Sequence, residues 1–243
     1  MTCPKCGGSG WIVVERGEVS GAERCDCTLE GRSARLEESA EIPPLYRNAS
    51  LDNFEASGPL KATVVAVRGY VREFPGGDKP GLLLIGEPGT GKTHLAVAAL
   101  RMLIARGFEG QFFDYQNLLD RIRASYDKSS GGSDRETYRA ALESEILLLD
   151  DLGAHRVTDW VEDIVTSIIT YRANHRKALI ATTNLRDPDA GDPPMPGGTA
   201  GDIAGKYYLA ERVGMRARSR LFEMCRVVRM PPVEDYRLRH SSA

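Results

Sequence analysis

The residues best suited to chemistry lie in a glycine-rich stretch that follows a short apolar run. Gly86 to Thr93, GEPGTGKT, fits the phosphate-binding loop G-x-x-x-x-G-K-[ST] at every fixed position. Glycines let the backbone turn successive N–H groups toward an anion, and a helix beginning near Lys92 adds the positive end of its dipole. The pattern predicts a nucleoside triphosphate site, with the Lys92 ammonium on the β- and γ-phosphates and the Thr93 hydroxyl on Mg²⁺.

Two acidic residues and one amide follow later apolar runs and suit the same site. Asp150 ends the run EILLLD, where its carboxylate would help to hold Mg²⁺, and Asp151 is the candidate to orient or deprotonate the attacking water. Asn184 ends the run ALIATTN, where its amide would hold that water near the γ-phosphate. A helix N-cap for the aspartates and a local turn for Asn184 are the structural alternatives. The residues expected to bind ATP are Gly86, Glu87, Pro88, Gly89, Thr90, Gly91, Lys92, Thr93, His94 and Asp150, with Thr93 and Asp150 also on Mg²⁺.

Four of the five cysteines lie near the N-terminus. Cys3-x-x-Cys6 and Cys25-x-Cys27 approximate a paired-cysteine zinc pattern, although the second pair is one residue short of the usual spacing. Four thiolates make a closed tetrahedral structural site, and so short a segment needs the metal for its stability. A disulfide pair is the alternative, which a secreted chain would favour. We predict one Zn²⁺ on these four cysteines and a buried core position for Cys225.

Apolar runs and amphipathic segments alternate from residue 60 onward, and they must position these side chains. The expected strands are short and apolar on both faces, which is typical of a parallel sheet covered by helices on both sides. The expected strands are 81–85, 110–115, 146–149 and 179–183, and the expected helices are 28–40, 60–74, 92–105, 117–126, 135–143 and 160–174. The pattern predicts an α/β fold in which the strands end beside the phosphate loop.

Proline and glycine mark the segments between these elements. Pro43-Pro44, in IPPLYRNASLDNF, excludes a helix and favours an extended path into the core. The stretch 186–202, RDPDAGDPPMPGGTAGD, is typical of a surface linker. We therefore expect a zinc-binding module at 1–30, a linker and leading segment at 31–54, and the ATPase domain at 55–243.

Composition excludes several classes of protein. The 243 residues are 42% hydrophobic and 27% charged, as in ordinary globular proteins. No apolar run approaches the ~18 residues of a membrane span, and the N-terminus has no signal-peptide character, so we expect a cytoplasmic protein without membrane contact. A formal net charge of −2 argues against a chain that coats nucleic acid through bulk electrostatics, although residues 206–239 are locally basic.

Several stretches carry a more specific resemblance. GEPGTGKTHLA, LLLDDLG, ATTNL and the tail RARSRLFEMCRVVRMPPVEDYR together resemble the AAA+ helicase-loader family, which includes the bacterial DnaC and DnaI proteins and their phage counterparts. The IstB transposition helpers are relatives of that family. The resemblance covers Ile42 to the C-terminus, since IPPLYRNASLDNF is similar to the family's segment ahead of the nucleotide domain. It implies an AAA+ P-loop NTPase core with little or no C-terminal lid.

The resemblance also implies a role for each candidate catalytic residue. Asp150 is implied as the Walker B magnesium residue, Asp151 as the catalytic acid and Asn184 as sensor 1. Arg220, in SRL, falls where the family places the arginine finger that completes a neighbouring subunit's site, so self-association through the AAA+ interface is implied too. Asp151 replaces the glutamate most common in AAA+ proteins and is one methylene shorter. This departure favours weak ATP hydrolysis that a partner or DNA stimulates.

Arg220 belongs to a group of arginines at 212, 216, 218 and 220. Spacings of four predict that Arg212 and Arg216 share a helical face, as do Arg216 and Arg220. A solvated basic stripe is the alternative for the group. The planar guanidinium of Arg220 suits the charge of a γ-phosphate, which favours a functional role there. Tyr115 and Tyr126 are candidates to stack on bases, with a core position as the alternative.

Two functions from different classes fit this chain. In the first, the N-terminal module docks on a hexameric replicative DNA helicase, and the ATPase core assembles on single-stranded DNA with ATP and Mg²⁺. In the second, an IstB-like transposition helper ATPase binds duplex DNA and a transposase. A small-molecule kinase shares the phosphate loop but explains neither the paired cysteines nor Arg220. The zinc module favours the helicase loader.

Overall fold

The structure is a computed structural model, and it describes residues 3–7, 9, 11–16, 19–124, 133–155, 158–191 and 208–239. Its elements in chain order are β1 (Trp11–Arg16), β2 (Val19–Arg24), α1 (Asp26–Ser39), η1 (Pro44–Tyr46), α2 (Leu60–Glu73), β3 (Gly81–Ile85), α3 (Lys92–Ala105), β4 (Gly110–Asp114), α4 (Tyr115–Ala124), α5 (Ser133–Glu143), β5 (Ile146–Asp150), α6 (Asp159–Asn174), β6 (Ala178–Thr183), η2 (Pro188–Ala190), α7 (Leu209–Val213), α8 (Met215–Met224), β7 (Cys225–Arg229) and α9 (Tyr236–Arg239).

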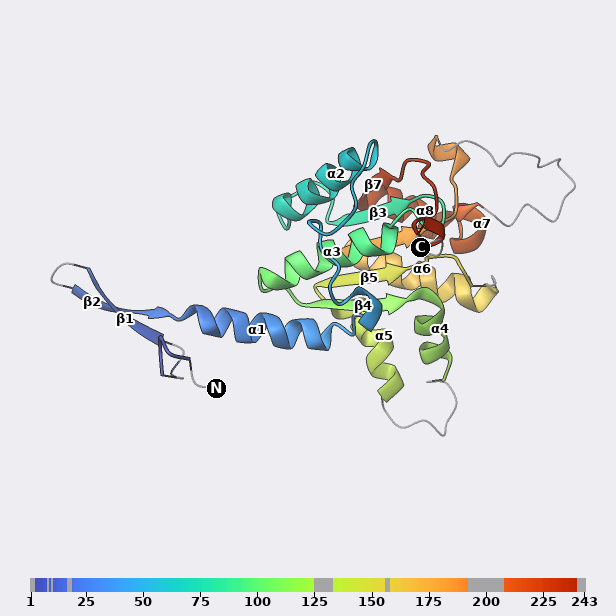
Figure 1. Ribbon diagram of the computed structural model, residues 1–243. Coiled ribbons are helices and arrows are strands. Elements are labelled where there is room, and N and C mark those ends of the chain that lie inside the picture. Colours follow the sequence, from blue (N-terminus) through green and yellow to red (C-terminus); the bar gives the residue numbers. More distant parts are fainter. Residues whose placement is uncertain are drawn as a thin grey trace, which may run out of the picture.

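The core is a five-stranded parallel sheet with the strand order β4-β5-β6-β3-β7 (Figure 1). Successive residues of β3 face opposite sides of the sheet. Leu82 and Leu84 pack with α2 and α3 on one side, whereas Leu83 and Ile85 pack with α4 to α8 on the other. Burial on both faces explains why the strands read as continuous apolar runs. The predicted α/β sandwich is confirmed.

Some elements differ from the sequence-based expectation. The hairpin β1–β2 and the edge strand β7 were not predicted, because each is short and neither carries a long hydrophobic repeat. Pro44 begins the short helix η1, so the expectation of a fully extended segment was wrong. Proline is compatible with the first position of a helix, since its missing N–H would have no partner there. Among the described residues, no helix combines the length and apolar character needed to cross a membrane.

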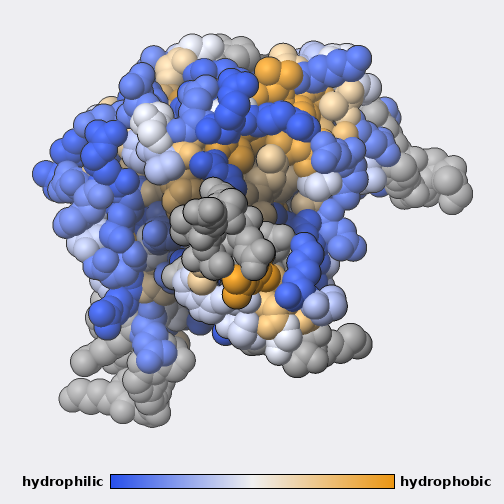
Figure 2. All heavy atoms as spheres, turned by 90° about the vertical axis from the view of Figure 1, so that its left-hand side faces the viewer, coloured by the Kyte–Doolittle hydropathy of each residue, from blue (hydrophilic) through white to orange (hydrophobic). Residues whose placement is uncertain are grey.

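Helix α1 joins the N-terminal hairpin to the core. Near its C-terminal end, Glu37 Oε1 accepts a hydrogen bond from Arg101 Nε of α3 at 2.5 Å. The Ala40 carbonyl, just after the helix, accepts from Phe112 N at 2.9 Å and so satisfies part of the edge strand β4. The other end of α1 carries the hairpin away from the sheet (Figure 1). Seen from that side, the described surface is predominantly hydrophilic (Figure 2).

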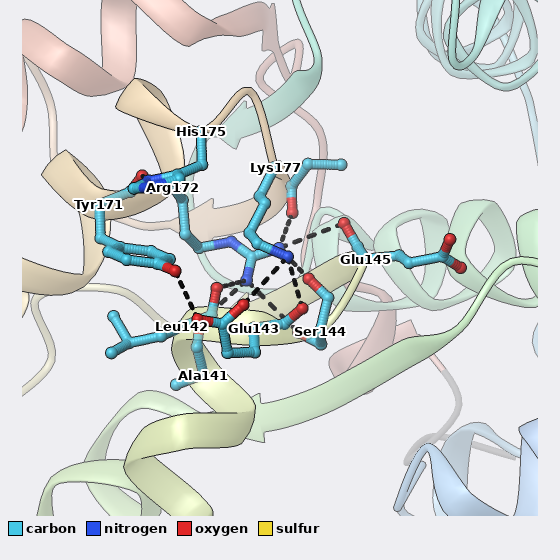
Figure 3. A network of polar contacts seen from close by, with 10 residues as sticks. Ala141, Leu142, Glu143, Ser144, Glu145, Tyr171, Arg172, His175 and Lys177 are labelled. Carbon is cyan, nitrogen blue, oxygen red and sulfur yellow. Dashed lines mark hydrogen bonds and ion pairs between the residues drawn. The ribbon is translucent and has the colours of Figure 1, made fainter.

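One buried arginine ties three elements of the core together. Arg172 of α6 is fully buried and points to the turn between α5 and β5 (Figure 3). Its two terminal nitrogens donate to the carbonyl oxygens of Ala141, Leu142, Ser144, Glu145 and Ala178, at 2.5–3.3 Å. Burial lowers the pKa of Arg172 to about 9, which leaves the guanidinium charged at neutral pH. The side chain therefore supplies donors to two carbonyls in the last turn of α5, to two in the turn that follows it and to one in β6.

Candidate active site

The glycine-rich loop connects β3 to α3 and is held from two sides. Gly91 has a φ of 88° and Gly89 a φ of 71°, in the left-handed region that favours glycine. A Cβ on Gly91 would lie 2.5 Å from the ring of Phe54, in the leading segment. A Cβ on Gly89 would lie 1.9 Å from the carboxylate of Asp235, in the C-terminal segment. Both glycines are thus required by conformation and by close neighbours.

Lys92 begins α3, and its side chain folds back over the loop. The residue is 5% exposed, and its Nζ donates to the Glu87 carbonyl at 2.8 Å. Thr90 Oγ1 donates to the same carbonyl at 2.8 Å. Burial lowers the pKa of Lys92, whereas the nearby Asp151 and Asp150 act in the opposite direction. The loop therefore presents a buried ammonium beside the first turn of a helix, which suits a bound phosphate group.

The structure brings Thr93 and Asp150 together. Asp150 ends β5 and is 7% exposed, and its Oδ1 accepts from Thr93 Oγ1 at 2.9 Å and from Thr182 Oγ1 at 2.6 Å. Burial raises the pKa of Asp150, and the hydrogen bonds from the two threonines oppose that rise. A hydroxyl and a carboxylate in contact beside a phosphate loop match the donor set that Mg²⁺ prefers. These residues could hold the metal of a Mg–nucleotide complex.

Asp151 and Asn184 follow β5 and β6, which are neighbours in the sheet. Asp151 has a φ of 53°, and its N–H donates to Thr182 Oγ1 at 2.9 Å, so β5 ends in a sharp turn. Its charge influences the pKa of Lys92, which lies close by. Asn184 is exposed directly after β6. Parallel strands end at the same edge of a sheet, and both side chains therefore belong to the edge that carries the phosphate loop.

The leading segment covers the side of the loop. His94 Nε2 lies 2.9 Å from the Ser50 carbonyl and 3.0 Å from Asn53 Oδ1, and its ring centroid is 5.4 Å from that of Phe54. His94 thus contacts protein groups of the leading segment. Tyr46 lies beside Thr93 and the Asp150 carboxylate, and burial raises the pKa of its phenol.

The four arginines do not form one stripe. Gly214, with a φ of 82°, separates α7 from α8, so the prediction that Arg212 and Arg216 share one helical face was wrong. Arg212 Nη1 donates to the His155 carbonyl at 3.1 Å, and Arg216 is exposed. Arg220 lies on α8, where its Nη1 donates to Glu223 Oε2 at 2.6 Å.

Sequence reasoning missed two residues that follow Asn184. Arg186 pairs with Glu87 of the loop at 2.5 Å, and Asp187 pairs with Arg218 of α8 at 2.5 Å. The interpretation of 186–202 as a surface linker was therefore wrong for its first residues, and residues 192–202 lie outside the described part. The only local signal was a pair of opposite charges shortly after Asn184.

Two aromatic candidates have separate outcomes. Tyr115 is 1% exposed at the start of α4, so it occupies the core and cannot stack on a base in this conformation. Tyr126 lies outside the described residues. Cys225 is fully buried as predicted, and burial raises the pKa of its thiol to about 12.

Three N-terminal cysteines form a separate cluster. The Sγ atoms of Cys3, Cys6 and Cys25 all lie within 4.8 Å of one another, and those of Cys3 and Cys25 are 3.8 Å apart. A tetrahedral zinc site with Zn–S bonds of about 2.3 Å has sulfurs about 3.8 Å apart, so this spacing fits the metal. Cys27 lies in the first turn of α1, but its side chain is outside the described part of the structure.

Comparisons with known proteins agree with this geometry. The profile of the family described as IstB-like ATP binding protein matches residues 73–188. The crystal structure of the DnaC helicase loader is 31% identical in sequence, with a TM-score of 0.63, and the match covers 78% of this chain and 100% of that one.

Two curated relatives match over shorter shares of their own lengths. The YqaM protein of Bacillus subtilis (strain 168) is 28% identical over 68% of this chain and 55% of its own length. The replicative helicase loader DnaC of Escherichia coli (strain K12) is 26% identical over 64% of each chain. Each match spans less than two thirds of the curated relative. The solved structure nevertheless matches over its whole length, and the predicted resemblance is confirmed. The chain belongs to the DnaC helicase-loader family of AAA+ proteins, and it carries the IstB-like ATP-binding domain.

Proposed function

We propose that this protein is an ATP-dependent loader of a replicative DNA helicase. One observation carries the proposal: the contact between Thr93 and Asp150 beside the buried Lys92, in a chain that belongs to the DnaC family. The loop N–H groups and Lys92 would hold the β- and γ-phosphates of ATP, and Thr93 and Asp150 would hold Mg²⁺. The metal would neutralise charge on the transferred phosphoryl group.

The remaining roles concern hydrolysis. Asp151 would orient the attacking water, and Asn184 would hold that water near the γ-phosphate. Arg220 would act in the neighbouring subunit's site after self-association, because a guanidinium supplied in trans stabilises transition-state charge. The short reach of Asp151 favours slow hydrolysis, which the helicase or DNA would stimulate.

The N-terminal module would recognise the helicase, while the ATPase core would bind single-stranded DNA. The position of the N-terminal module at the far end of α1, away from the sheet, supports a separate docking role for it (Figure 1). One Zn²⁺ on Cys3, Cys6, Cys25 and Cys27 would stabilise the module, and the spacing of the three described sulfurs supports this assignment.

The match to the IstB-like profile favours a second candidate, a transposition helper that binds duplex DNA and a transposase. A pull-down from host lysate distinguishes the two. Tagged protein with ATP should recover a hexameric helicase, identified by mass spectrometry, and the Lys92→Ala variant should recover less of it. Recovery of a transposase without helicase would contradict the loader and support the second candidate.

A further inference from the structure

We propose that Arg186 and Asp187 couple each subunit's own phosphate loop to helix α8, and so position the arginine that α8 presents to the next subunit. The inference rests on the proposed function, because it concerns the regulation of that ATP site. Arg186 and Asp187 act here as positioning residues, since both work through other side chains. Arg186 makes an ion pair with Glu87 of the phosphate loop, and Asp187 makes an ion pair with Arg218 of α8.

The first contact joins Arg186 to the loop. Arg186 Nε and Nη2 donate to Glu87 Oε1 at 3.2 and 2.5 Å. The Glu87 carbonyl meanwhile accepts from Lys92 Nζ at 2.8 Å. Glu87 is thus bound to Arg186 through its side chain and to the phosphate-binding lysine through its backbone. A phosphate that draws the Lys92 ammonium away from this carbonyl alters the same residue that holds Arg186.

The second contact joins Asp187 to α8. Asp187 is 1% exposed, and its two carboxylate oxygens accept from Arg218 Nε and Nη2 at 2.5 and 2.6 Å. This paired geometry fixes the relative orientation of the two side chains more tightly than a single contact does. Asp187 Oδ1 also accepts from Ala190 N at 3.2 Å, which holds the start of η2 in place. The Asp187 carboxylate is therefore bound both to Arg218 of α8 and to the backbone of η2.

A third set of contacts includes the neighbouring helix. The Arg186 carbonyl accepts from Leu209 N at 2.9 Å, at the start of α7, and Arg186 forms a β-bridge with Tyr208. Arg186 thus contacts the start of α7, and Asp187 contacts the middle of α8. Arg220 lies two residues beyond Arg218 on α8.

The sheet provides a second connection between α8 and the phosphate loop. Helix α8 continues directly into β7, and β7 pairs with β3, the strand that leads into the loop. The loop and α8 are therefore joined by a strand pair on one side and by two ion pairs on the other. A change in the conformation of the loop when ATP binds would therefore change which positions α8 occupies relative to the loop. Coupling between two such sites typically changes binding affinity by about 5- to 150-fold.

The test uses the full-length protein with ATP and single-stranded DNA. Wild type should show a sigmoidal dependence of hydrolysis on ATP concentration. Arg186→Gln and Asp187→Asn should each make it hyperbolic, with a Hill coefficient of about 1, and should lower kcat, because α8 no longer follows the state of the loop. ATP affinity by calorimetry should stay close to that of wild type, because Arg186 contacts only the Glu87 side chain of the loop and Asp187 contacts α8. Glu41→Gln is the matched control for Arg186→Gln, since it breaks a comparably exposed ion pair with Arg121 at 3.0 Å.

A charge exchange separates coupling from simple loss of packing. Arg186→Glu places two acids in contact, and the added change Glu87→Arg restores an ion pair of reversed polarity. The double variant should recover sigmoidal kinetics that Arg186→Glu alone lacks. Sigmoidal wild-type kinetics that persist in Arg186→Gln, or hyperbolic wild-type kinetics, would overturn the coupling. Wild type that neither binds nor hydrolyses ATP would instead overturn the proposed function itself.

Discussion

At the scale of single residues, the site depends on a short chain of hydroxyl and carboxylate contacts. Thr93 and Thr182 both donate to the same oxygen of Asp150. The carboxylate is thus held in place before any metal arrives, and the second carboxylate oxygen makes neither of these contacts. Among the described residues of the loop, Lys92 is the only one with a positive charge, and its side chain is buried.

Loss of the lysine charge should remove most of the affinity for ATP. Lys92→Ala should weaken ATP binding by about 10- to 150-fold, the range expected for hydrogen bonds to charged groups. Calorimetry measures this directly, and Lys61→Ala on the exposed face of α2 is the control. Equal affinity in Lys92→Ala and wild type would contradict the assignment of the loop.

Neutralising Asp150 should separate nucleotide binding from metal binding. Asp150→Asn keeps an oxygen that can accept from the two threonines but removes the negative charge. ATP should still bind without Mg²⁺, the enhancement of binding by Mg²⁺ should disappear, and hydrolysis should stop. Titrations with and without Mg²⁺ measure the difference. A variant with undiminished Mg²⁺ dependence would show that Asp150 is not a metal ligand.

At the scale of elements, much of the core and the loop could be predicted from sequence. The runs at β3, β5 and β6 are apolar on both faces, and the glycines mark the loop without reference to distant residues. The pairs Glu87–Arg186 and Asp187–Arg218 could not be predicted, because residues so far apart carry no local periodicity. The break between α7 and α8 was missed because Gly214 looks like an isolated glycine in a helical pattern.

The Arg172 network should contribute strongly to stability. Arg172→Met removes a donor from five carbonyl oxygens in the core, and a buried polar group left without a partner costs about 1–3 kcal/mol. Lys177→Met is the matched control, since Lys177 Nζ donates to the Glu143 carbonyl at 2.6 Å from a more exposed position. Urea unfolding should show a loss below about 1 kcal/mol for the control. Equal losses in both variants would contradict this role of Arg172.

The cysteine cluster should behave as an independent metal site. The purified protein should contain one Zn²⁺ per chain, and Cys25→Ser should lose it because Cys25 lies among the other sulfurs. Cys225→Ala should keep the metal, since Cys225 begins β7 and is buried in the core, away from the N-terminal cysteines. Metal analysis with well under one equivalent in the wild type, together with disulfides in a thiol titration, would contradict the zinc assignment.

At the scale of the whole molecule, the chain combines an AAA+ body with a projecting N-terminal arm, which consists of the hairpin and the first half of α1 (Figure 1). The C-terminal half of α1 belongs to the body, because Ser33 and Glu37 contact α3, and Ala40, directly after the helix, contacts β4. A truncation that removes the module should therefore keep α1 and delete only residues 1–25. We expect this variant to bind ATP as the full chain does and to lose helicase recruitment in the pull-down.

The subunit interface gives a further test of cooperation. Arg220→Ala should bind ATP normally but hydrolyse it poorly, because the missing guanidinium belongs to the neighbour's site. Mixed with Lys92→Ala protein, it should regain activity, since the Lys92→Ala subunit presents an intact arginine to an intact loop next door. A guanidinium in trans contributes roughly 10³–10⁵ in rate in related reactions, so partial pairing is measurable. A mixture that co-assembles but stays inactive would show that Arg220 does not act in trans.

Transfer of a helicase onto closed circular single-stranded DNA tests the central claim most directly. The hexameric helicase recovered in the pull-down cannot thread onto a closed circle by itself, so bound helicase after gel filtration reports loading. With wild-type protein and ATP, we predict that helicase elutes with the single-stranded circle, and that Lys92→Ala and the 1–25 deletion leave it free. No transfer by the wild type, with binding of the protein to a duplex circle instead, would contradict the loader assignment.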